Sequence, residues 1–399
     1  MSGKRITILV FLLILVAAIA GAIFFVYRYF EAARADQTHY EQDETELVVV
    51  NLTSARLALF RAGRNLSEAQ PVPEFGGERI WLTKGNYFLQ AEQNGTTVFY
   101  PVPIQGYRSG TEKDDTFAIT IRPLPEEYPP ALLPESGFVF IPSGHFLFGD
   151  RLNPREPHLV WTQGFFIARL EISNAEFRQF LSAADGYADD ANWTPLGKDW
   201  KARFQTRASA RLTPNDAEFK RFGQDDQPVT QVTWFEAAAF CRWLTRKFGG
   251  GRLLFSLPTE AEWEKAARGP DNFDYPLGQT VSDAESRLYN WKKNPSAEVT
   301  VVGAGETLQK FQPNRYGIYH LGGNVVEWTQ GLRRAFNQDK PYEPDDRNRE
   351  DSPEVRVVRG GSWYSASNAL LYVPYRDHFL PEISHDDLGF RIVVRSLMF

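Results

Sequence analysis

The chain of 399 residues carries 44 basic and 50 acidic side chains, a formal net charge of -6. This length predicts two or three domains, and a hydrophobic content of 43% excludes a wholly disordered chain. The acidic balance argues against a nucleic-acid partner, because binding along a phosphate backbone needs a basic face. The single cysteine, Cys241, excludes an internal disulfide, a zinc ribbon and a copper site with two thiolates.

Residues 1–30 are predicted to anchor the chain in a membrane. Residues 6–27 carry no charge and would cross a bilayer as one helix. Lys4 and Arg5 precede this run and favour a cytoplasmic N-terminus. A cleavable signal peptide is the alternative, because residues 17–22 are rich in small side chains. We expect a single-pass membrane protein whose C-terminal domains lie outside the cytoplasm, in the periplasm or at the cell surface.

An acidic stalk is predicted over residues 31–46, followed by a small all-β domain over residues 47–122. The domain is indicated by short alternating runs, such as residues 80–82 and 116–121, with glycine turns between them. Residues 82–89 resemble the middle of PEGA-type surface β-domains. Because the segment holds no catalytic cluster, we interpret it as a spacer or a partner-binding domain.

Residues 123–136 contain five prolines and are predicted to form a semi-rigid linker, since proline restrains the backbone and cannot donate a hydrogen bond. The remaining residues, 137–399, are predicted to form one large domain. Strands are expected at residues 138–141, 355–359 and 390–394. Long stretches between them have no periodicity, so we expect a loop-rich α+β domain.

Capping boxes mark three helix starts in the large domain, at Ser173, Thr233 and Thr259. Each hydroxyl is followed by a glutamate three residues later, and the two side chains can satisfy each other's backbone N–H groups. The helix after Thr233 carries Cys241 on its apolar face, together with phenylalanine and leucine. We therefore interpret Cys241 as a small buried hydrophobic side chain.

Six motifs follow one another in the large domain. They begin at Phe140-Ile141-Pro142-Ser143-Gly144, Pro228-Val229-Thr230, Leu257-Pro258-Thr259-Glu260, Gly322-Gly323-Asn324, Arg359-Gly360-Gly361-Ser362-Trp363 and Gly389-Phe390-Arg391. In this order they resemble the formylglycine-generating enzyme family, also called sulfatase-modifying factors. The resemblance runs from about residue 137 to residue 394 and implies a loop-rich α+β fold related to C-type lectins, preceded here by the transmembrane helix and the all-β domain.

The resemblance also implies a copper(I) ion held by two cysteine thiolates after the Arg-Gly-Gly-Ser element. In this chain the two positions are Ser365 and Leu370. A serine hydroxyl is a hard ligand with a high pKa, and leucine offers no ligand atom. The sequence therefore predicts the family fold without copper and without the family's oxidase activity.

The resemblance further implies a calcium site on Asn324 and Glu327, whose amide and carboxylate oxygens suit Ca²⁺. The alternative is that Glu327 braces a local turn and no ion binds. A second family calcium site uses an asparagine and a later aspartate. Asn290 matches the asparagine, but no clear counterpart of the aspartate precedes Gly317.

Between the last two motifs the sequence mixes aromatic, amide and charged side chains. In the family this stretch lines the ligand groove, and tyrosine and arginine provide large adaptable contacts. The predicted groove residues are Tyr364, Ser365, Asn368, Tyr372, Tyr375, Arg376, Asp377, His378 and His385. We expect a peptide, a glycan or a partner protein to bind there.

Three functions stay open on these residues. The first is a membrane-anchored, non-catalytic binding or scaffold protein. The sequence is typical of a bacterial protein. The second is a metal-dependent enzyme of the same family with altered chemistry, using His378 or His385. The third is a ligand-binding protein whose segment between Tyr364 and Leu388 is diversified by a retroelement.

Overall fold

The computed structural model describes residues 44–105, 116–126, 128–130, 137–153, 157–204, 207–282, 285–294, 300–336, 341–343 and 348–397. The predicted anchor and most of the acidic stalk lie outside these residues. Within the described part of the chain, no helix is both long enough and apolar enough to span a bilayer. The membrane anchor therefore stays a prediction.

The N-terminal unit consists of strands and one short 3-10 helix, Leu66–Glu68. One sheet has the order β4-β1-β7 and the other the order β3-β2-β5-β6. Leu47, Leu89 and Val102 belong to one apolar cluster that includes side chains from both sheets. The strands are β1 (Glu44–Asn51), β2 (Arg56–Arg61), β3 (Gln70–Pro71), β4 (Arg79–Thr83), β5 (Gly85–Gln93), β6 (Thr96–Ile104) and β7 (Thr116–Ile121).

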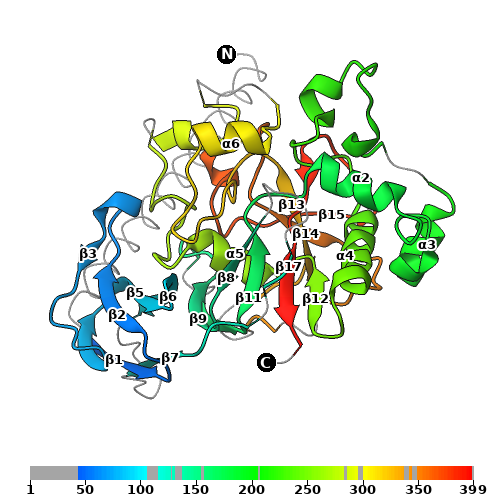
Figure 1. Ribbon diagram of the computed structural model, residues 1–399. Helices are drawn as coiled ribbons and strands as arrows, with labels where there is room; N and C mark the ends of the chain where they lie inside the picture. The colour runs from blue at the N-terminus through cyan, green and yellow to red at the C-terminus, as the bar shows by residue number, and fades with distance from the viewer. Residues whose placement is uncertain are drawn as a thin grey trace, which may run out of the picture.

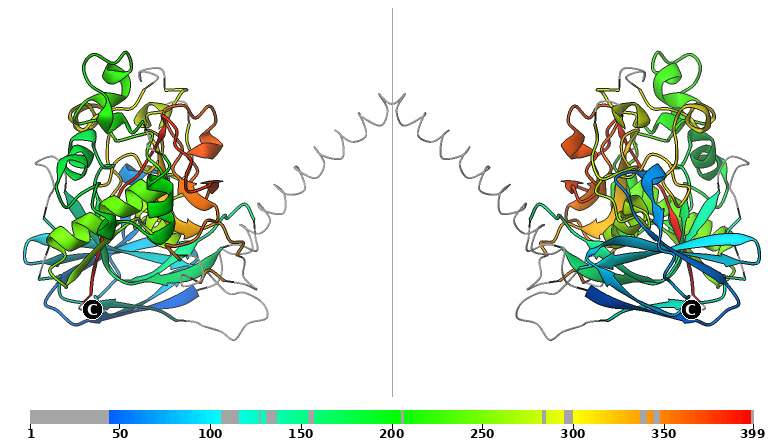
Figure 2. Two further views of the ribbon diagram at one scale, coloured as in Figure 1. Left: turned by 90° about the vertical axis from the view of Figure 1, so that its right-hand side faces the viewer. Right: turned by 90° about the vertical axis from the view of Figure 1, so that its left-hand side faces the viewer.

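This N-terminal unit lies to one side of the larger domain, where its blue and cyan strands are seen in Figures 1 and 2. Polar contacts join the two. The Asn272 amide donates to Oδ1 of Asn86 at 3.0 Å. Arg315 donates to the carbonyl oxygen of Leu66 at 2.8 Å and lies 4.5 Å from the ring centroid of Phe88. The β strands are thus in direct contact with the larger domain.

The large domain is a mixture of helices and sheets, as expected. All three capping boxes form, at the starts of α2 (Asn174–Ser182), α4 (Trp234–Phe248) and α5 (Glu260–Arg268). In each, the glutamate accepts from the N-cap backbone and the hydroxyl accepts in return. Two further helices are α3 (Pro195–Lys201) and α6 (Ala304–Lys310).

Two four-stranded sheets organise the large domain (Figure 1). One has the order β12-β17-β11-β8, and the other, β15-β14-β13-β16, carries the candidate site. A two-stranded sheet pairs β9 with β10. The strands are β8 (Phe138–Ile141), β9 (Gly144–Phe148), β10 (His158–Thr162), β11 (Phe165–Ala168), β12 (Leu253–Ser256), β13 (Val326–Leu332), β14 (Arg356–Arg359), β15 (Asp377–Phe379), β16 (Leu388–Gly389) and β17 (Val393–Ser396).

The strand expected at residues 390–394 begins only at Val393. The carbonyl oxygen of Ile392 accepts from the N–H of Ala168, at the end of β11, and that of Phe390 accepts from the N–H of Ile172, beyond the end of β11. The side chain of Arg391 is buried in an ion pair with Glu327. This short irregular segment therefore places a charge in the core before the regular strand begins.

Candidate functional site

The loop after β14 closes one side of a cleft. Gly360 and Gly361 have φ angles of 97° and 66°, in the left-handed region that favours glycine. A Cβ atom on Gly361 would lie 2.6 Å from the carbonyl oxygen of Leu370 and 3.0 Å from Oγ of Ser365. Glycine is therefore required for the segment from Ser365 to Leu370 to fold back against the strand end.

The cleft has a volume of about 140 Å³ and lies between this loop and the sheet β15-β14-β13-β16. Apolar lining comes from Val326 and Val358, on neighbouring strands, and from Leu370 and Phe379. Four of the predicted groove residues line the cleft, namely Tyr364, Ser365, Tyr375 and Asp377. The structure thus brings part of the predicted groove together over an apolar floor.

The tyrosines leave substantial aromatic surface open to solvent at this cleft. Tyr364 is 57% exposed and Tyr375 is 37% exposed. The ammonium group of Lys292 lies 4.7 Å from the ring centroid of Tyr364. Asp387, which belongs to the same stretch, also lines the cleft and accepts a 2.7 Å hydrogen bond from Oγ of Ser362. Burial raises the pKa of Asp387 above its usual range.

Strand alternation separates Asp377 from His378. Neighbouring side chains of a strand point to opposite faces, so Asp377 and Phe379 face the cleft and His378 faces away. Nδ1 of His378 lies 2.6 Å from Nη1 of Arg333. His385 packs its ring against Phe379, with centroids 5.2 Å apart. The two histidines therefore sit in different surroundings.

Three other predicted groove residues also lie outside the cleft lining. Arg376 forms an ion pair with Glu260, donating from Nε to Oε2 at 2.5 Å and from Nη2 to Oε1 at 2.9 Å. Tyr372 donates its hydroxyl to Oδ1 of Asp150 at 2.7 Å. Asn368 is exposed in a short 3-10 helix, Asn368–Leu370. The first two of these side chains hold neighbouring segments together.

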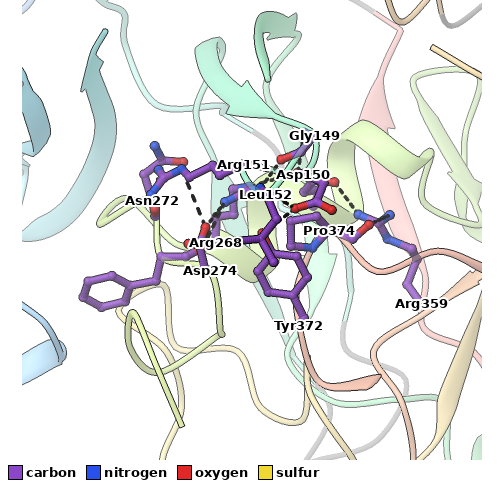
Figure 3. Close-up of polar contacts among 12 residues, drawn as sticks. Gly149, Asp150, Arg151, Leu152, Arg268, Asn272, Asp274, Arg359, Tyr372 and Pro374 are labelled. Carbon is purple, nitrogen blue, oxygen red and sulfur yellow. Dashed lines mark hydrogen bonds and ion pairs between the residues drawn. The ribbon is translucent and has the colours of Figure 1, made fainter. Parts of the chain in front are cut away.

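A buried charge network supports the sheet behind the cleft (Figure 3). Arg268 donates to Oε1 of Glu264 at 2.9 Å and to Oδ1 of Asp274 at 3.0 Å. Arg359 of β14 pairs with the other oxygen of Glu264. Burial alone would raise the pKa of Glu264, but Arg268 and Arg359 outweigh it and hold the pKa below its usual value. The network fixes β14, and with it the start of the cleft loop.

The sequence motifs do not predict this network. Glu264 and Arg268 are four residues apart on α5, the spacing at which helical side chains meet, and this was the one local signal. Arg359 is 95 residues away from Glu264 in the sequence. That pairing is set by the packing of the sheet on the helix, which no local pattern contains.

The two positions that the resemblance assigns to copper thiolates lie in the same cleft. Oγ of Ser365 accepts a 2.9 Å hydrogen bond from the N–H of Ser362, so the hydroxyl stabilises the turn. Leu370 contributes an apolar side chain to the lining. Copper(I) requires soft sulfur ligands, but the cleft offers a hydroxyl group at Ser365 and an aliphatic side chain at Leu370. The residues present therefore do not fit a copper(I) ion.

Cys241 cannot replace these ligands. It is 2% exposed and belongs to the apolar cluster around α4. Burial raises the pKa of its thiol well above the usual value. Within the described residues, no three histidine, cysteine, aspartate or glutamate side chains are grouped so that they could hold a metal ion.

The predicted calcium residues have protein partners. Both carboxylate oxygens of Glu327 accept from Arg391. Oδ1 of Asn324 accepts from the Asn290 amide at 2.9 Å and from the N–H of Val302 at 2.8 Å. Oδ1 of Asn290, in contrast, is buried without a hydrogen-bond partner. Asn290 thus fits an additional cation better than Glu327 does, because Arg391 already neutralises Glu327.

Residues 125–396 match the family model described as the sulfatase-modifying factor enzyme 1-like domain. The match begins inside the segment predicted as a linker and covers the helices and sheets of the large domain. It includes all of the cleft residues described above.

Three curated relatives carry different names. The serine/threonine-protein kinase pkn1 of Chlamydia pneumoniae is 29% identical over 271 residues, 67% of this chain and 39% of that protein. The formylglycine-generating enzyme of Mus musculus is 27% identical over 308 residues, 64% of this chain and 74% of that protein. The inactive C-alpha-formylglycine-generating enzyme 2 of the same organism is 28% identical over 288 residues, 64% of this chain and 85% of that protein.

The chain spans about 39% of the length of the first of these relatives. The two mouse proteins are almost equally similar to this chain, although one is named as an enzyme and the other as inactive. Overall identity therefore does not decide between an active and an inactive domain, and the side chains at the cleft carry that argument.

Proposed function

Because this chain belongs to the sulfatase-modifying factor family, we propose that its large domain uses the family cleft for binding and does not perform copper-dependent oxidation. The observation that carries the proposal is the pair Ser365 and Leu370. Both line the cleft, and the serine hydroxyl is engaged by the backbone of Ser362. A thiolate pair is the chemistry that copper(I) needs, and this cleft does not supply it.

The ligand of this cleft is a peptide, a glycan or a segment of a partner protein. Exposed aromatic side chains such as Tyr364 and Tyr375 gain much contact area at a small entropic cost when a ligand covers them. Asp377 and Asp387 add hydrogen-bond acceptors at the same cleft. Apolar side chains of the floor, such as Val326, favour a ligand with an apolar part.

The predicted membrane anchor would determine where in the cell the cleft binds its ligand. A helix over residues 6–27 would hold the chain at the membrane, and the N-terminal β strands would act as a spacer. The large domain would then present the cleft outside the cytoplasm. An enzyme with altered metal chemistry has less support, because His378 faces away from the cleft and contacts Arg333.

Binding is tested by exposing the purified protein to arrays of peptides and glycans. The Tyr364→Ala variant is compared with a Phe204→Ala control, since Phe204 is 60% exposed and lies elsewhere on the surface. We expect at least one ligand class to bind the wild type and the control equally, and to lose about tenfold in affinity with Tyr364→Ala. If no ligand discriminates between the two variants, the proposal for this cleft is wrong.

A further inference from the structure

A second cavity is lined by residues at the N-terminal end of α2 and of helix α6. Its volume is about 300 Å³, at the lower end of the range for small-molecule sites. Apolar walls come from Phe138, Leu170, Ile172 and Val302. Among the described residues, it shares no lining residue with the cleft near Ser365. This cavity is therefore a separate candidate site.

The buried carboxyl group of Glu171 lines the cavity. Glu171 is 5% exposed, and its Oε1 accepts a 3.1 Å hydrogen bond from the Asn324 amide. Both oxygens of Glu327 accept from Arg391, so this cation is already paired. Within the described part of the chain, no arginine, lysine or histidine forms an ion pair with Glu171. A buried carboxylate without its own counter-ion is costly, and a cationic ligand would offset that cost.

The other charged residues of the cavity also favour a cationic ligand. Other acidic residues of the cavity lining are Glu176, Asp225 and Asp226. No lysine, arginine or histidine occurs among the described residues that line it. The cavity therefore combines apolar walls with negative charge.

We propose that this cavity binds a small organic cation, a primary amine with an apolar body, whose ammonium group pairs with Glu171. The apolar body lies against the walls around Ile172 and Val302, where it loses contact with water. The ammonium group donates hydrogen bonds to the carboxylate, and such charge-assisted bonds are stronger than neutral ones. This site is independent of the proposed function of the cleft.

Calorimetry with two matched probes tests the proposal. The probes are 2-phenylethylamine and 2-phenylethanol, which share an apolar body and differ in charge. At pH 7 we expect the amine to bind the full chain at least tenfold more tightly than the alcohol. Equal affinities for the two probes, or no binding of either, overturns the proposal.

Two variants locate the site. Glu171→Gln keeps an acceptor for the Asn324 amide and removes the charge, so the amine should lose at least tenfold in affinity while the alcohol is unaffected. Ala175→Leu fills part of the cavity from α2 and should weaken both probes, which keeps the test decisive if the first variant does not fold.

The matched control is Glu306→Gln. It removes the same charge from α6 outside the cavity lining, in a residue that pairs with Lys310 at the surface. This control should bind the amine as the wild type does. If Glu171→Gln and Glu306→Gln lower the affinity equally, the amine responds to the general negative potential of this region, and Glu171 is not its partner.

Discussion

Arg391 and Glu327 form a two-pronged ion pair in the interior of the large domain. Nε of Arg391 donates to Oε2 of Glu327 at 2.7 Å and Nη2 donates to Oε1 at 2.6 Å, and both side chains are fully buried. The indole N–H of Trp263 donates to the same Oε2 at 2.8 Å. Arg391 also donates to the carbonyl oxygen of Tyr319 at 2.9 Å. The pair thus joins β13, α5 and two loops.

Breaking this pair should strongly destabilise the domain. Arg391→Met leaves the Glu327 carboxylate buried without its cation, which costs about 3–5 kcal/mol in comparable cases. The free energy of unfolding in urea measures the effect. The control is Arg79→Met, which breaks an exposed pair with Glu46 and should cost less than about 1 kcal/mol. Equal losses for the two variants would show that the buried pair contributes no more than a surface pair.

Acid should destabilise the protein partly through His320. Burial, with a further effect of the Arg391 charge, lowers the pKa of this imidazole from 6.5 to about 3. Nε2 of the neutral ring lies 2.8 Å from Oγ1 of Thr307. Because the unfolded chain binds this proton more readily, the contribution of His320 is fully present above pH 6.5 and is lost as the pH falls towards 3.

The variant His320→Asn tests this expectation. The φ angle of residue 320 is 56°, which asparagine tolerates better than most residues. We expect lower stability at pH 7 but a smaller loss between pH 6.5 and pH 4.5, by about 2 kcal/mol, since one proton corresponds to about 1.4 kcal/mol per pH unit. Unfolding free energies at both pH values supply the comparison. A loss identical to that of the wild type would assign the acid sensitivity to other groups.

Calcium is expected to act through Asn290. Its buried Oδ1 atom has no hydrogen-bond partner, and an amide oxygen is a suitable Ca²⁺ ligand. We expect Ca²⁺ to raise the midpoint of thermal unfolding relative to a chelator, and Asn290→Ala to remove the increase. Asn192→Ala is the control, because Asn192 is another fully buried asparagine and lies outside this region. No effect of Ca²⁺ on the wild type would refute the calcium prediction.

Local features of the sequence predicted the fold well where neighbouring residues determine the structure. The capping boxes at Ser173, Thr233 and Thr259 form because all of their hydrogen bonds join residues three positions apart. The two positions that the family motifs assign to the copper ligands, Ser365 and Leu370, line one cleft. Ordered motifs achieve this because they carry the register of an entire fold.

Side-chain direction could not be predicted in the same way. Arg376 was expected in the groove but pairs with Glu260, 116 residues away in the sequence. Arg356 lies fully buried with its guanidinium group 3.8 Å from the ring centroid of Trp234. Such partners are chosen by the packing of sheet on helix, which the spacing of residues along the chain does not contain. Glu327 is the clearest example, since its cation is 64 residues away.

Copper binding and cysteine oxidation test the central claim most directly. The purified protein is loaded with copper(I), the copper bound per chain is counted, and oxygen consumption is measured with a cysteine-containing peptide. The control is a double variant, Ser365→Cys with Leu370→Cys, which places thiols at both cleft positions and should gain copper(I) affinity. We predict that the wild type holds no copper at this cleft and leaves the peptide unchanged. One tightly bound copper ion per wild-type chain, together with oxidation of the peptide cysteine, would contradict the account.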